Sequence, residues 1–281
     1  LALALSAECK SKSLLTLIEE ASHFPYGVSL PLYALPTTAG TGSEVTPFAT
    51  VWDKEKKRKL SLSGPSVFPN FAFVDYELTH SLPAETTLHS GLDSINQALE
   101  SICSKNSTPL SEIYAQRSLL LGLNALPVLM DNLKDTNSRC SISESSLLAG
   151  LAISQTRTGL CHSISYPLTT HFGIPHGLAV AFTMPFMLKH NLTKGDRRFE
   201  RLASVLNPNS PFCSTELVEN FVQLNKRFKV AEKVKLKVRS LDALLDIQNE
   251  MFTPGRCDNG IAPVNEQIVK NILCDSWDSV I

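Results

Sequence analysis

Two histidines and an aspartate are the side chains of this sequence best suited to act together on a metal ion. His162 and His176 stand fourteen residues apart in CHSISYPLTTHFGIPHG, and Asp93 stands in GLDSINQALE. One carboxylate and two imidazoles form a three-ligand set for Zn²⁺ or Fe²⁺, which leaves a coordination position open for a substrate oxygen. The chemistry predicted from these residue types is therefore metal-assisted binding of a substrate.

Asp93 and Gln97 are four residues apart in a stretch with helical periodicity. Residues at this spacing project from one face of a helix, so both side chains can point toward one site. The opposite face carries an apolar stripe made of Leu88, Leu92, Ile95, Leu99 and Ile102. The alternative is that Asp93 and Gln97 are polar surface positions of an amphipathic helix.

The two histidines also have a structural interpretation. His162 is predicted on a short helix with Tyr166 one turn later, and a histidine among apolar residues is often a satisfied core residue. His176 stands in GIPHG, a tight turn that fixes the direction of its side chain. The residues alone leave core packing and metal ligation both open.

The elements that must position these residues fall into two parts. Up to about residue 80, helix and strand patterns alternate, with a helix expected over 13–24 and strands over 28–36, 48–52, 59–64 and 71–75. Beyond it the patterns are helical, over 82–102, 110–130, 141–154, 159–170, 179–189, 217–228 and 265–277. We therefore predict an α/β domain over 1–80 and an all-helical domain over 81–281.

Composition excludes several classes of protein. The chain has 281 residues, 43% of them hydrophobic and 19% charged, with a net charge of −1, as in ordinary globular proteins. The basic run KEKKRK (54–59) is predicted as a solvated hairpin turn, and 229–239 as an exposed charged face, so nucleic acid is not an expected partner. Seven scattered cysteines without a CxxC pair favour reduced thiols and a cytoplasmic location. No apolar run approaches the roughly 18–20 residues that a membrane span needs.

Several motifs, taken in order, resemble the iron-containing alcohol dehydrogenase family. They are PTTAGTGSEVT (36–46), FVDYELTHSLP, GLDSINQALE (91–100), HSISYPL, GIPHG and GRCDNG (255–260). The resemblance implies a dehydroquinate-synthase-like architecture, in which a Rossmann-like α/β cofactor domain, here incomplete, precedes an all-helical metal-binding domain. It also implies a metal, Fe²⁺ or Zn²⁺, between the domains, and NAD(H) or NADP(H) as the source of hydride for a carbonyl.

The same resemblance assigns roles at the candidate metal site. Asp93, His162 and His176 match three of the family's four metal ligands. The fourth is usually a histidine, and Gln97 stands in its place, so we expect a three-ligand or loosened site. Tyr166 replaces a further histidine of the family, and its hydroxyl can itself donate a proton or a hydrogen bond.

The resemblance also places part of the cofactor site. It implies that Thr37, Thr38, Gly40 and Ser43 face phosphate or ribose oxygens of the nucleotide, whereas the residues alone equally suit a turn before a capped strand. The family's Gly-Gly-Gly-Ser pyrophosphate loop is expected shortly before the position of Leu1. We therefore expect the chain to begin within the helix that follows this loop.

The resemblance predicts an alcohol dehydrogenase that reduces a small aldehyde and forms a homodimer. HSISYPLT is most similar to the phosphonoacetaldehyde reductases of the family, and Thr170 and His171 are candidate ligands for an anionic substrate tail. The alternative is that Thr169 and Thr170 cap the helix end and that His171 packs under the GIPHG turn. Two other functions stay open at this stage: a dehydroquinate-synthase-like lyase and a non-catalytic remnant without metal.

Overall fold

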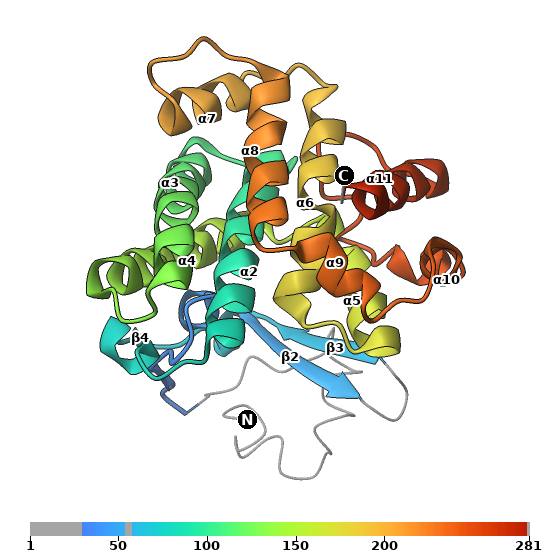
Figure 1. The fold of residues 1–281 in the computed structure, drawn as a ribbon. Coiled ribbons are helices and arrows are strands. Elements are labelled where there is room, and N and C mark those ends of the chain that lie inside the picture. The colour runs from blue at the N-terminus through green and yellow to red at the C-terminus, as the bar shows by residue number, and fades with distance from the viewer. Residues whose placement is uncertain (1–29, 54–57, 280–281) are drawn as a thin grey trace.

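The fold is dominated by helices that surround one long central helix (Figure 1). A computed structural model describes residues 30–53 and 58–279. Its helices are α2 (Ala84–Cys103), α3 (Pro109–Asp131), α4 (Thr136–Thr156), α5 (Leu160–Phe172), α6 (His176–Leu192), α7 (Arg198–Leu206), α8 (Ser214–Arg227), α9 (Val230–Lys235), α10 (Leu241–Leu245) and α11 (Glu266–Asp278).

The described strands all precede these helices. They form two pairs: β1 (Tyr33–Ala34) runs parallel to β4 (Phe71–Ala72), and β2 (Phe48–Asp53) runs antiparallel to β3 (Arg58–Ser63). The predicted hairpin is therefore present, although its turn residues 54–57 and the predicted helix 13–24 lie outside the described residues. Few strands followed by many helices match the expected combination of an incomplete Rossmann-like part and a helical part.

Helix α2 occupies the centre of the helical part. It packs against α3 and α4 on one side and against α6 on the other (Figure 1). Its predicted apolar stripe is fully buried, and Leu92, Ile95 and Leu99 are inaccessible to solvent. The interpretation of its polar residues as surface positions is wrong, because Asp93 and Gln97 are only 4% and 3% exposed. The neighbouring helices α5 and α6 place His162 and His176 beside the buried Asp93 carboxylate.

Three short helices near the end of the chain, α7, α9 and α10, were not predicted. They contain 9, 6 and 5 residues, too few turns for a clear apolar period. The prediction of an exposed face over 229–239 is wrong in part, because Val230, Val234 and Val238 are buried between the charged residues. In the described part of the chain, no helix has the length and apolarity needed to cross a membrane.

The start of α6 lies unusually close to α2. A Cβ atom at Gly177 would stand 1.8 Å from the carbonyl oxygen of His89, so only glycine permits this approach. The crossing places His176, the residue before this glycine, beside the helix that carries Asp93. The two candidate ligands are therefore brought together by a backbone contact between helices.

We expect Gly177→Ala to lower the free energy of unfolding by about 1–3 kcal/mol or more, because the added methyl group must push α6 away from α2. Chemical denaturation measures this loss. Gly64→Ala is the matched control, since its added Cβ would meet no atom within 4 Å. Equal stability of the two variants would contradict the close crossing.

Candidate metal centre

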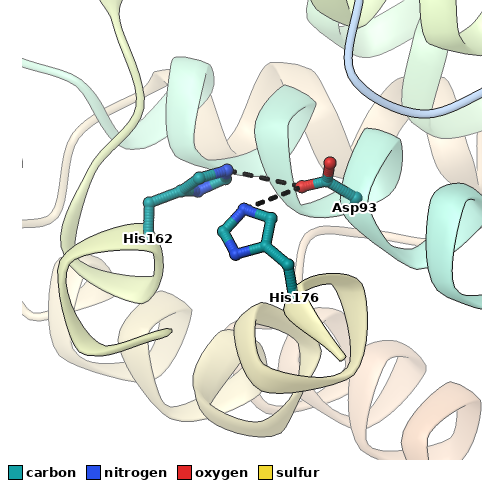
Figure 2. Close-up of side chains that lie close together, drawn as sticks. All are labelled: Asp93, His162 and His176. Atoms are coloured by element: carbon teal, nitrogen blue, oxygen red, sulfur yellow. Dashed lines mark ion pairs between the residues drawn. The ribbon is translucent and has the colours of Figure 1, made fainter. Parts of the chain in front are cut away.

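Three helices each bring one candidate ligand to a common point: Asp93 from α2, His162 from α5 and His176 from the first turn of α6. Figure 2 shows both imidazole rings directed at the Asp93 carboxylate. The distances from Asp93 Oδ1 are 3.4 Å to Nε2 of His162 and 4.0 Å to Nε2 of His176. One ligand atom from each of the three residues lies within 4.8 Å of the other two.

The spacing of these atoms suits a metal ion. Ligands at about 2.0–2.2 Å from one Zn²⁺ stand roughly 3–4 Å from each other, so small side-chain shifts bring all three into contact with one ion. Gln97 supports the same use, because its buried Oε1 has no hydrogen-bond partner among the described residues. An amide oxygen with this placement, one helical turn from Asp93, can accept a cation as a weak fourth ligand.

Each histidine is held through its other ring nitrogen. His162 Nδ1 lies 2.6 Å from Oε2 of Glu100, a side chain that is only 1% exposed. His176 Nδ1 lies 3.2 Å from the Ser165 hydroxyl, which donates its own proton to the backbone oxygen of His162. Both Nδ1 atoms therefore lie against acceptors, so in the neutral form of each ring the Nε2 atom has a lone pair that faces Asp93. Acceptors that face one another attract a cation, as in metal sites with a carboxylate–histidine pair.

Glu100 also fixes the start of α5. Its two carboxylate oxygens accept from the backbone N–H groups of Gly159 at 2.8 Å and His162 at 3.2 Å. Burial acts to raise the pKa of this carboxyl, but the His162 ring and the two backbone donors outweigh it and hold the pKa below its ordinary value. Burial acts in the opposite sense on His162, and the carboxylates of Glu100 and Asp93 raise its pKa. The site therefore favours positive charge.

The three candidate ligands open onto a cavity of about 380 Å³. Tyr166 forms part of its wall and stacks on the His176 ring, with 6.1 Å between ring centroids. Burial raises the pKa of the Tyr166 hydroxyl, so this group stays protonated and can donate a hydrogen bond near neutral pH. The other residues along the wall are Thr41, Ser43, Thr46, Phe48, Thr50, Gln97, Ile153, Thr158 and Arg256.

The predicted cofactor residues are divided between the cavity and the loop beside it. Ser43 lines the cavity, whereas Thr37, Thr38 and Gly40 do not. The glycine at 40 is needed for packing, because a Cβ there would stand 2.7 Å from Cβ of Ser90 on α2. The motif therefore holds its loop against the helices, and its contact with a nucleotide stays a prediction.

The structure does not bring the predicted substrate ligands Thr170 and His171 to the cavity. The Thr170 hydroxyl donates to the backbone oxygen of Tyr166 at 3.1 Å, and His171 Nε2 pairs with Glu250 at 2.8 Å. On α5, His162 and Tyr166 line the cavity, whereas Thr170 and His171 in the last turn do not. Tyr166 and Thr170 are one helical turn apart on α5, as predicted. The sequence could not show which residues of this helix face the cavity.

Two residues of the site were missed. Glu100 is seven positions after Asp93, which is two helical turns and the same face of α2, so its spacing was an available signal. Arg256 belongs to GRCDNG, a motif that contributed to the resemblance without a role being assigned to it. Its distance along the chain from the other site residues concealed its place in the cavity.

Comparison with known sequences shows the family to which this chain belongs. Residues 87–247 match the model of the Fe-containing alcohol dehydrogenase family, C-terminal, and residues 2–76 match that of iron-containing alcohol dehydrogenase. A phosphonoacetaldehyde reductase from Streptomyces viridochromogenes is 40% identical over 56% of this chain and 40% of its own length. A sulfoacetaldehyde reductase from Bilophila wadsworthia is 32% identical over 63% of this chain and 46% of its own length. The chain thus spans about half the length of such relatives, or less.

Solved structures agree with this result. A sulfoacetaldehyde reductase from Bifidobacterium kashiwanohense, crystallised with NAD⁺, has a TM-score of 0.82 and 25% identity over 98% of this chain and 72% of its own. An iron-containing alcohol dehydrogenase from Thermotoga maritima has a TM-score of 0.79 and 26% identity over 98% of this chain and 70% of its own. The chain belongs to the iron-containing alcohol dehydrogenase family, which favours the dehydrogenase expectation over the lyase alternative.

We expect Glu100→Gln to weaken Zn²⁺ binding by about 10- to 100-fold, the usual effect of losing a partner behind a metal-ligating histidine. An amide in this place sets an N–H group against the donors of Gly159 and His162, and one unsatisfied buried donor costs about 1–3 kcal/mol. Calorimetric titration of metal-free protein measures the affinity. Glu144→Gln on α4 is the control, because the Glu144 side chain is 45% exposed. Equal affinity in both variants would exclude the positioning role of Glu100.

Gln97→His is expected to act in the opposite direction. An imidazole nitrogen is a better ligand for Zn²⁺ than a neutral amide oxygen, so affinity should rise about tenfold or more, which corresponds to about 1.4 kcal/mol. The same titration measures the change, with Gln155→His at an exposed position as the control. A Gln97→His protein that binds no more tightly than the unmodified chain would show that this position is outside the coordination sphere.

Proposed function

We propose that the protein reduces an aldehyde to an alcohol with NADH or NADPH and a bound Fe²⁺ or Zn²⁺. The observation that carries this proposal is the approach of Asp93, His162 and His176 ligand atoms to within 4.8 Å of one another on a cavity wall. Membership of the family supports the reaction type, and a structural neighbour crystallised with NAD⁺ supports the cofactor. The two-domain division near residue 80 is part of the same proposal.

The residues of the chain have separate tasks in this reaction. When bound, a divalent metal supplies Lewis acidity toward the carbonyl and the reduced nicotinamide supplies a hydride. Asp93 and the two Nε2 atoms would hold the metal, while Glu100 and Ser165 keep the rings in the required orientation. The reduction adds a hydride to the carbonyl carbon and a proton to its oxygen, and the Tyr166 hydroxyl on the cavity wall is placed to donate to that oxygen.

Within this class we propose phosphonoacetaldehyde as the substrate and 2-hydroxyethylphosphonate as the product. Support comes from the 40% identity to a phosphonoacetaldehyde reductase and from two sulfoacetaldehyde reductases among the relatives, since both names describe a short aldehyde with an anionic tail. We also propose a cytoplasmic homodimer. The free thiols of the described cysteines support that location.

The test is a reductase assay on full-length protein stripped by a chelator and reloaded with Fe²⁺ or Zn²⁺. Activity should disappear with the metal and return on reloading. Asp93→Ala should lose about 10²-fold or more in kcat/KM, because metal charge stabilisation is worth several kcal/mol. Asp242→Ala, an exposed carboxylate on α10, is the control. Undiminished activity of the Asp93 variant or of chelated protein would refute the proposal.

A further inference from the structure

Arg256 contributes a guanidinium group to the wall of the same cavity that holds the candidate metal ligands. Its Nη1 donates to the Thr158 hydroxyl at 2.7 Å, and its guanidinium carbon lies 5.7 Å from the centre of the Phe48 ring. These contacts hold the side chain from two sides, one polar and one aromatic. Its direction is therefore fixed toward the cavity.

The turn that carries Arg256 is fastened to the segment before α5. Asn259 donates from Nδ2 to the backbone oxygens of Thr156 at 2.8 Å and Thr158 at 3.0 Å, and it is only 3% exposed. On the other side of the arginine, the Ser163 hydroxyl on α5 accepts from the backbone N–H of Thr253 at 2.8 Å. The turn with Arg256 is therefore held both by the segment before α5 and by α5 itself, the helix that carries His162.

The positive charge of Arg256 has no acidic partner among the described residues. In the described ranges no carboxylate forms an ion pair with this residue, although other arginines of the helical part, such as Arg201 and Arg227, have acidic partners at 2.7 Å. A half-buried guanidinium has five N–H donors, and the Thr158 hydroxyl accepts from one nitrogen only. The remaining donors suit the planar, forked recognition of an oxyanion.

We propose that Arg256 binds the anionic tail of the substrate, so that the enzyme selects short aldehydes carrying a tetrahedral oxyanion such as a phosphonate or sulfonate. This inference rests on the proposed function, because the tail and the aldehyde belong to one molecule in one cavity. Thr158 is a positioning residue that orients the guanidinium. The hydroxyl groups of Thr41 and Thr46 on the cavity wall can share the remaining oxygens of the tail.

The experiment compares kcat/KM of metal-loaded full-length protein for phosphonoacetaldehyde, sulfoacetaldehyde and neutral butanal. Arg256→Gln should lower the ratio of kcat/KM for an anionic substrate to kcat/KM for butanal by about 10- to 150-fold. This is the usual effect of losing a hydrogen bond to a charged group, and it should appear chiefly in KM. Arg256→Lys keeps the positive charge but loses the forked donor geometry of the guanidinium. Its ratio should lie between those of the unmodified protein and Arg256→Gln. The two anionic substrates distinguish phosphonate from sulfonate selection.

Arg197→Gln is the matched control, since this side chain is 85% exposed and outside the cavity, and the ratio should not change. Thr158→Val is a second variant that leaves Arg256 in place and should lower the ratio by a smaller factor. Calorimetric titration with methylphosphonate, which has no carbonyl group, should show binding to the unmodified protein and much weaker binding to Arg256→Gln.

The assignment would be overturned if the unmodified protein preferred butanal. It would also be overturned if Arg256→Gln lowered kcat/KM equally for anionic and neutral aldehydes, or if it changed only the KM of the nicotinamide cofactor. If metal-loaded protein reduces none of the aldehydes, the proposed function fails instead. In that case the methylphosphonate titration still decides whether Arg256 binds an oxyanion.

Discussion

The buried hydrogen bond between Glu100 and His162 is the interaction on which the site depends. A carboxylate inside a helical core is costly unless its oxygens are satisfied, and here the beginning of α5 supplies three donors. The same contacts fix where α5 starts and which nitrogen of His162 faces Asp93. One buried charge therefore joins α2 to α5 and prepares the ring to meet a cation.

Close packing of backbones supplies the second constraint. The approach of Gly177 to His89 places α6 against α2, and with it the ring of His176 opposite Asp93. Gly42, with φ of 59°, packs in the same way against Gly150 on α4 and holds the loop that supplies Ser43 to the cavity. The loop that contributes to the polar wall of the cavity is thus held against rigid helices.

The proposed metal ligands and the proposed role of Arg256 would give the cavity two separate chemical functions. The acidic and imidazole groups of α2, α5 and α6 suit the polarisation of a carbonyl, whereas Arg256 suits a substrate oxyanion. Both are anchored to the same segment around α5, so the reacting group and the tail of one molecule can be held in a fixed relation.

Local sequence patterns are sufficient to determine many features of this protein. The periodicity of Leu88 to Ile102, the Asp93–Gln97 spacing and the ordered motifs were sufficient to predict the main helices, the family and the candidate ligands, since these signals lie within a few turns of chain. Tertiary packing alone decided that Asp93 and Gln97 are buried, that Thr170 and His171 turn away, and that Arg256 joins the cavity. The physical reason is that contacts between distant residues, such as Glu100 with His162 and Thr158 with Arg256, depend on how helices and turns pack, and no local spacing encodes that packing.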